Sequence, residues 1–205
     1  MKLGIAIIVF LAVIIVGLIC VLIWVPVSQN DLTESWPVYQ NLEPQFSFRY
    51  PPGSTVVPGS GDGLHLDEPI DFPPVLVSVI TPRVDTFSEN GSYGYYETRI
   101  RVLAAGDIEH GCDGFNIQAS GFDQQVGSTT IAGTTAFIFK RGDGAAGNRV
   151  EVIRYALCKD GMGLIIEDVF ATGSDGTPLT KKLVSDITLA RANNERVVRS
   201  IRFVH

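Results

Sequence analysis

The sequence predicts an α+β fold, in which a twisted antiparallel sheet is covered by packed helices and is preceded by one N-terminal transmembrane helix. Three observations lead to this prediction. Short segments along most of the chain alternate apolar and polar side chains, as half-buried strands do. The apolar spacing changes to that of a helix near the C-terminus, and residues 3–25 contain no charged side chain.

The uncharged segment from Leu3 to Val25 is long enough for a membrane anchor. At ~1.5 Å per residue it reaches across a hydrocarbon core of ~30 Å, and it is longer than the apolar part of a cleaved signal peptide. We therefore expect residues 1–27 to be an uncleaved anchor and residues 28–41 a short tether. Lys2 precedes the anchor, so the N-terminus is expected in the cytoplasm and residues 42–205 outside the cell membrane, as an extracytoplasmic domain.

The domain begins with strands. Phe46-Ser47-Phe48-Arg49-Tyr50 alternates strictly, and Pro51-Pro52-Gly53 ends it. Further strands are expected at 64–66, 75–80, 115–119, 124–131, 134–140, 149–157 and 164–171. Gly142-Asp143-Gly144 is interpreted as a turn, and Asp160-Gly161 joins the last two strands as a hairpin.

Residues 86–105 fit two interpretations. Tyr96, Ile100 and Leu103 have the spacing of one helical face, whereas the alternation of Ile100 with Val102 fits a strand. We expect a helix in this stretch.

A second helix is expected near the C-terminus. Thr177 is a suitable N-cap, and Pro178 would take the first helical position. The apolar stripe that follows consists of Leu179, Leu183, Val184 and Ile187. Asn193-Asn194 is expected to interrupt the helix before Val197, Val198 and Ile201 resume an apolar face.

Several motifs resemble those of PsbP-like domains. Phe46-Ser47-Phe48-Arg49-Tyr50-Pro51, preceded by residues 36–41, resembles the opening strand of that family, and Ile131-Ala132-Gly133 resembles its central Ile-x-Gly step. The paired strands of residues 149–171 and the ending Arg199-Ser200-Ile201-Arg202-Phe203 resemble its last third. The resemblance covers most of the chain from Trp36 to Phe203.

The resemblance implies an α/β/α sandwich around a twisted antiparallel sheet. Members of the family include an extrinsic subunit of the oxygen-evolving complex, a nuclear import factor that binds a small GTPase, and membrane-anchored bacterial proteins. None is a well-established enzyme, so the resemblance implies a non-catalytic role and assigns no functional residue.

Charge argues against nucleic acid as a partner. The chain of 205 residues has a formal charge of −6, and the part after Val27 keeps all 22 acidic residues but only 15 of the 16 basic ones, which makes it −7. A domain of this charge does not favour nucleic acid or anionic lipid.

Two cysteines follow the predicted anchor, and they form a candidate disulfide, Cys112 with Cys158. An even number of cysteines in an oxidising compartment permits one bridge. The alternative is two separate buried cysteines.

No cofactor or metal is expected. Asp107, Glu109, His110, Cys112 and Asp113 are potential metal ligands, but they are almost contiguous in a loop, whereas a zinc site needs ligands spaced to converge. We interpret this stretch as a solvated connector.

We expect no catalytic activity, because the chain lacks the common catalytic motifs and its histidines are far apart in the sequence. The alternative is an envelope hydrolase in which His65 or His110 acts as a base and meets a carboxylate such as Glu167 or Asp168. A further alternative is a small-ligand binding module.

Tyr93, Tyr95 and Tyr96 lie close to Gly91 and Gly94. Tyrosines in such a segment are typical of recognition surfaces, and we take the three as a candidate interaction patch. The expected function is that of a membrane-anchored, non-catalytic domain that binds a protein partner or forms a subunit of an envelope complex.

Overall fold

A computed structural model of the chain describes residues 33–59, 74–87, 93–107, 124–145, 147–175 and 180–204. The chain divides into two compact units, Met1–Glu34 and Ser35–His205, and the fold described below belongs to the second. The expected anchor at residues 1–27 and the strands expected at 64–66 and 115–119 lie outside the described residues.

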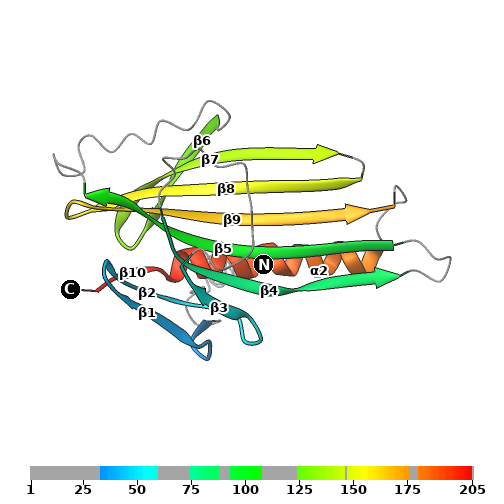
Figure 1. Cartoon of the computed structure of the whole chain (residues 1–205), viewed down its shortest axis with the longest axis horizontal. Helices are drawn as coiled ribbons and strands as arrows, with labels where there is room; N and C mark the ends of the chain where they lie inside the picture. The colour runs from blue at the N-terminus through cyan, green and yellow to red at the C-terminus, as the bar shows by residue number, and fades with distance from the viewer. Residues whose placement is uncertain are drawn as a thin grey trace, which may run out of the picture. The chain divides into compact units, whose positions relative to one another are not determined.

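Strands make up most of this unit (Figure 1). The strands and the helix are β1 Val38–Leu42, β2 Gln45–Arg49, β3 Thr55–Pro58, β4 Val75–Phe87, β5 Tyr93–Asp107, β6 Gln124–Ile131, β7 Thr134–Ala145, β8 Asn148–Lys159, β9 Met162–Ser174, α2 Lys181–Ser200 and β10 Arg202–Phe203. They form a three-stranded sheet of order β1-β2-β10 and a seven-stranded sheet of order β3-β4-β5-β9-β8-β7-β6. The strand pairings are antiparallel.

The predicted fold class is wrong in two respects. The fold is mainly β, with two antiparallel sheets, and α2 is the one helix in the described part of the chain, where the expectation was an α+β sandwich with several packed helices. The transmembrane helix is also not found: no helix among the described residues is both long enough and apolar enough to cross a membrane.

The helix expected within residues 86–105 is wrong, because the described residues of this range belong to the strands β4 and β5. β5 pairs with β4 on one side and with β9 on the other along most of its length. Ile100 and Leu103, which the helical interpretation placed on one face, point to opposite faces of this strand and are both buried. Because both faces of the sheet are covered at this point, apolar residues occur at odd-numbered and even-numbered positions of β5, and their spacing resembles that of a helix.

The strands that show a clear period were predicted correctly. β6 has the expected bounds, and β4, β7, β8 and β9 contain the expected strands and extend beyond them. Asp160 and Gly161 both have positive φ, 52° and 80°, in the turn between β8 and β9, as an Asp-Gly hairpin requires. Gly142-Asp143-Gly144, however, lies within β7 and is not a turn.

Helix α2 begins three residues later than expected. Its N-cap is Thr180, whose hydroxyl accepts a hydrogen bond from the Leu183 N–H at 3.2 Å. The expected break at Asn193-Asn194 does not occur, because the Asn194 side chain is buried and bonded. Its Nδ2 donates to Asp168 at 2.6 Å, and its Oδ1 accepts from the Thr98 hydroxyl at 3.2 Å.

The C-terminal end of α2 packs into the main core between the two sheets. Val197, Val198 and Ile201 are buried there together with Phe46 and Phe48 of β2. The helix also contacts β5 of the larger sheet. The alternation in β2 therefore has the core-facing side that the sequence predicted.

A buried charge cluster crosses three strands of the larger sheet, on the face opposite α2. Glu167 of β9 is directly opposite Arg101 of β5 and Arg154 of β8. Its carboxylate accepts from Arg101 Nη1 at 2.9 Å and from Arg154 Nε at 2.6 Å, and the three residues are 0%, 2% and 6% exposed respectively. We call these residues the Arg–Glu–Arg triad.

Glu167→Gln should destabilise the domain by about 3–5 kcal/mol, because removing one partner of a buried ion pair leaves the others uncompensated. Glu195→Gln removes an equal charge from the exposed pair with Arg199 at 2.7 Å and should cost less than about 1 kcal/mol. Urea denaturation of both variants measures this difference. Equal losses would show that the triad contributes no more than a surface pair.

Candidate functional site

The β4–β5 hairpin carries two of the three tyrosines in the candidate patch on one face. Tyr95 pairs with Asp85 and Tyr93 with Phe87 across the two strands. Directly opposite residues in an antiparallel pair point to the same face of the sheet. The four side chains therefore share the face opposite α2, at the end of the sheet where β4 ends and β5 begins, on the right in Figure 1.

Arg83 joins these side chains into one connected group. Its guanidinium lies over the Tyr95 ring, 3.9 Å from the centroid, and its Nε is 2.9 Å from Asp85 Oδ1. The Tyr93 hydroxyl donates to the same Asp85 oxygen at 2.6 Å and also contacts Arg83 Nη2. The Phe87 ring follows at 5.2 Å from the Tyr93 ring. We call Arg83, Asp85, Phe87, Tyr93 and Tyr95 the Tyr–Arg surface.

Mutual hydrogen bonding keeps this group in one ionisation state. The Tyr93 hydroxyl, followed by Arg83, holds the pKa of Asp85 below its ordinary value. Asp85 in turn raises the pKa values of Arg83 and of Tyr93. Asp85 is therefore ionised, Arg83 charged and Tyr93 protonated at neutral pH.

A glycine makes room for the Tyr95 ring. Gly173 of β9 is directly opposite Tyr95, and a Cβ at this position would lie 2.2 Å from Tyr95 Cε1 and 2.4 Å from Asn148 Oδ1. The Tyr95 hydroxyl donates to that Asn148 oxygen at 3.2 Å. The ring is thus held between Arg83 and the bare backbone of Gly173.

Tyr96, the third residue of the candidate patch, does not belong to this surface. It points to the α2 side, is 8% exposed and stacks on Phe170 with ring centroids 6.1 Å apart. Leu183 and Ala190 of α2 complete this small core cluster. Sequence reasoning placed three tyrosines together, whereas strand alternation separates Tyr96 from the other two.

Arg83, Asp85 and Phe87 were not recognised from the sequence. Their spacing of two residues, Arg83-x-Asp85-x-Phe87, matches that of Tyr93-x-Tyr95 in the next strand. This signal becomes readable only once both segments are taken as strands of one hairpin, and the expectation of a helix at 86–105 concealed it.

The other candidate residues lie mostly outside the described part of the chain. These are His65, His110 and Cys112, together with Glu109 and Asp113 of the potential metal ligands. No cluster of metal-ligating side chains occurs among the described residues.

No disulfide between two described residues occurs, because Cys158 is the one cysteine that they contain, and its predicted partner Cys112 lies outside them. Cys158 of β8 is 7% exposed and is in the disulfide-bonded form, so it is not a free thiol. No described contact pairs it with Cys112.

Both carboxylates that the hydrolase alternative invokes are buried. Glu167 is held by the two arginines of the Arg–Glu–Arg triad. Asp168 is on the opposite face, where burial raises its pKa to about 6 against the lowering effects of the Asn194 hydrogen bond and of Arg191. Neither lies on the Tyr–Arg surface.

Comparisons with known proteins find distant structural similarity. No family model and no curated protein sequence matches the chain. The chain is similar to the crystal structure of LpqN, a protein involved in cell envelope biogenesis of Mycobacterium tuberculosis, with a TM-score of 0.38 and 11% identity over 82% of this chain and 85% of LpqN. It is also similar to a crystal structure from Bacteroides thetaiotaomicron, with a TM-score of 0.32 and 12% identity over 62% of this chain. The chain spans 45% of the length of that second protein.

Gly173→Ala should displace the Tyr95 ring from beneath Arg83, at a stability cost of about 1–3 kcal/mol. The Arg83 side-chain protons lie over the ring, so their NMR signals should lose an upfield ring-current shift. Gly142→Ala is the matched control, because a Cβ there meets no atom closer than 3.9 Å. An unchanged Arg83 shift in Gly173→Ala would contradict the role assigned to this glycine.

Asp168→Asn should change how stability depends on pH. The pKa of Asp168 is about 6 in the folded protein against an ordinary value of 3.8, so the folded state binds a proton that the unfolded state has released. The wild-type unfolding free energy should therefore fall relative to that of the variant as pH rises from about 4 to about 7, by up to ~3 kcal/mol.

Asp186→Asn, on the exposed side of α2, removes the same charge and serves as the control. Denaturation of the three proteins at pH 4, 5, 6, 7 and 8 measures the difference. A constant gap between Asp168→Asn and the wild type across this range would show that the carboxyl does not titrate as stated.

Proposed function

We propose that this domain is a non-catalytic binding domain that recognises a protein partner through the Tyr–Arg surface. The observation that carries the proposal is the Arg83 guanidinium stacked on Tyr95, within a connected group of aromatic and charged side chains at the open end of the sheet. Tyrosine and arginine are enriched among the residues that contribute most to protein–protein binding.

The exposure of this group supports a binding role. The Phe87 side chain is 75% exposed, although Phe87 belongs to a strand. Among the described aromatic residues, the Tyr93 ring is the one that its ring contacts. Arg83 and Asp85 keep 46% and 43% of their side chains exposed. A partner can bury Phe87 against an apolar side chain while its polar groups reach the neighbouring ion pair.

The group is also ordered before a partner binds. Arg83, Asp85 and Tyr93 hold one another by hydrogen bonds, and Gly173 fixes the Tyr95 ring. Ordered aromatic side chains lose little conformational entropy on binding, which raises the affinity that a given contact area provides.

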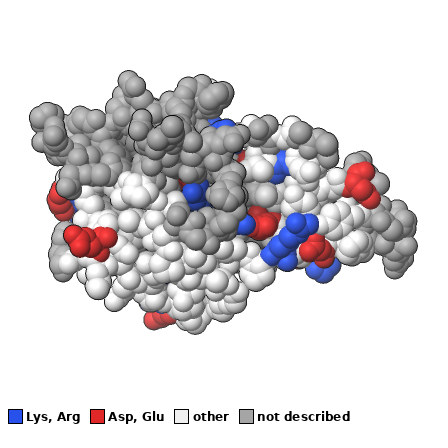
Figure 2. Space-filling model, viewed as in Figure 1, with Lys and Arg blue, Asp and Glu red and all other residues white. Residues whose placement is uncertain are grey.

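Charge on the visible face is compatible with a protein partner. Figure 2 shows basic and acidic side chains interspersed among a larger uncharged area of the described residues, without a broad field of one sign. Nucleic-acid surfaces depend on extended positive charge. The non-catalytic part of the proposal is supported by the other contacts of Glu167 and Asp168, each of which is already engaged in the core.

We place this binding role in the cell envelope, as the sequence analysis expects. Kinship with PsbP-like domains, which include non-catalytic subunits of larger complexes, belongs to the same proposal. The sequence motifs of β2 and of the C-terminal segment support this kinship.

Site-specific photo-crosslinking in the cells that make the protein tests this function. p-Benzoylphenylalanine replaces Phe87 in the full chain and, as a control, Leu189, an exposed apolar residue of α2 that is 58% exposed. We expect a protein adduct of defined mass from position 87 that position 189 does not give. Mass spectrometry of the adduct identifies the partner and the segment that it presents.

The same experiment in a Tyr93→Ser, Tyr95→Ser background tests the surface itself. Both side chains lie on the exposed face, so the folded domain should remain stable while the adduct falls at least tenfold. Circular dichroism and thermal denaturation check the fold. Equal adducts from positions 87 and 189, no adduct from position 87, or an adduct that persists without the tyrosines would contradict the proposal.

A further inference from the structure

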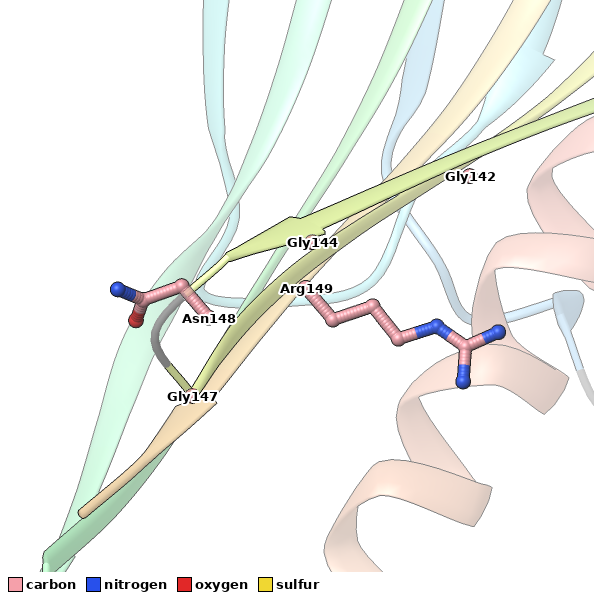
Figure 3. Close-up of a pocket in the computed structure, with 5 residues that line it drawn as sticks. All are labelled: Gly142, Gly144, Gly147, Asn148 and Arg149. Atoms are coloured by element: carbon pink, nitrogen blue, oxygen red, sulfur yellow. The ribbon is translucent and has the colours of Figure 1, made fainter. Parts of the chain in front are cut away.

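A hollow of about 520 Å³ opens near the β7–β8 hairpin, on the face of the larger sheet that carries α2. The described residues that line it are Gly142, Gly144, Gly147, Asn148 and Arg149 (Figure 3). Its volume lies within the range of small-molecule sites. We call it the glycine hollow.

Strand register explains why the space is empty. Gly142 of β7 is directly opposite Glu151 of β8, and Gly144 is opposite Arg149. All four residues share the face on which α2 lies, and the two glycines have no side chain to fill it. β6 pairs with β7 only as far as Lys140, so it does not reach this part of the sheet.

Three cations among the described residues act on the Glu151 carboxylate beside the hollow. Arg191, Arg149 and Lys140, in this order of effect, act on Glu151 and contribute to the low pKa of its carboxyl. Glu151 is therefore ionised, and with Asp168, which also lies within the field of Arg191 and Glu151, the group has a local net charge of +1 at neutral pH in a chain of charge −6. This excess favours an anion.

The two arginines differ in how firmly they are held. Arg191 binds both Glu151 oxygens, at 3.2 and 3.1 Å, and lies over the Phe170 ring at 4.3 Å. Arg149 reaches Glu151 only at 3.9 Å and keeps 71% of its side chain exposed. In Figure 3 its guanidinium extends along the hollow towards α2, whereas Asn148 points the other way. Arg191 thus neutralises Glu151, and Arg149 retains donors for a ligand.

A carboxylate suits this arrangement better than a phosphate. The guanidinium of Arg149 presents parallel N–H donors that match the two oxygens of a carboxylate. Glu151 lies close by, so a phosphate group, which carries up to two charges on one centre, would meet stronger repulsion than a carboxylate group, which carries one. The glycine backbone leaves flat space in which the rest of such a ligand can lie.

We propose that the glycine hollow is a binding site for a carboxylate-bearing ligand, held by Arg149 above Gly142 and Gly144. The hollow and the Tyr–Arg surface lie on opposite faces of the sheet, so the proposal does not depend on the proposed function. The carboxylate can belong to a small molecule or to an acidic peptide, and the experiment distinguishes these sources.

Titration of the ¹⁵N-labelled protein followed by NMR tests the site. The probes are succinate, an acetylated and amidated tetraglutamate peptide, and inorganic phosphate, at constant ionic strength. We expect saturable shifts of the Gly142, Gly144 and Arg149 amides with a carboxylate probe, and weaker binding of phosphate. Saturation by succinate indicates a small-molecule ligand, and saturation by tetraglutamate alone indicates a peptide.

Three variants separate the site from general electrostatic attraction. Arg149→Gln should weaken carboxylate binding at least tenfold, and Gly142→Leu should do the same by filling the hollow, since a Cβ at position 142 meets only Val150 O at 3.9 Å. Arg199→Gln removes an equal charge from the exposed pair with Glu195 and should leave binding unchanged.

Four results would overturn the proposal. These are the absence of saturable shifts with either carboxylate probe, full binding by Arg149→Gln, an equal loss in Arg199→Gln, and tighter binding of phosphate than of the carboxylates. Gly142→Leu also reports on folding through its own amide spectrum, so a loss of binding with a native spectrum is the supporting result.

Discussion

Glu167 lies between Arg101 and Arg154 at the centre of the larger sheet, and this buried carboxylate constrains three strands at once. The two contacts fix β5 and β8 relative to β9, because a shift of one residue in either pairing would move an arginine to the α2 face and leave a buried charge without its partner. On that other face, Asp168 is bonded to Asn194 of α2, so the same strand also fixes the position of the helix. Register and helix docking are thus both set along β9.

Both candidate binding sites depend on this register. Tyr95, Gly173 and Asn148 are aligned across β5, β9 and β8, which lets the tyrosine ring lie flat on one face. One pair further along, Gly144 faces Arg149 and opens the hollow on the opposite face. The two sites therefore occupy the same end of the sheet, one on each side, and a protein that engaged both would have to reach around the β7–β8 hairpin.

Local signals in the sequence predicted much of this fold. The alternation of Phe46 and Phe48, the bounds of β6 and the Asp160-Gly161 turn all depend on near neighbours, and each is confirmed. The errors arose where a distant contact decides. Asn194 does not break α2 because Asp168 and Thr98 satisfy its side chain.

The same reason limited the prediction of the sites. Two of the three candidate tyrosines lie on the Tyr–Arg surface. Which two depends on the alternation of side chains between the two faces of β5, and the interpretation of this stretch as a helix concealed that alternation. Arg83 becomes a partner of Tyr95 only through the pairing of β4 with β5. Gly142 and Gly144 resemble turn residues in the sequence, and only their register against Glu151 and Arg149 shows that they form a hollow.

The central claim is that the domain binds a partner at the open end of β4 and β5. Amide hydrogen exchange of the domain alone and in complex with the protein captured at position 87 tests it most directly. The account predicts that protection on binding is confined to residues 81–87 and 93–98, with no change along the exposed side of α2. Protection centred on α2 or on β6, with the β4–β5 hairpin unchanged, would contradict it.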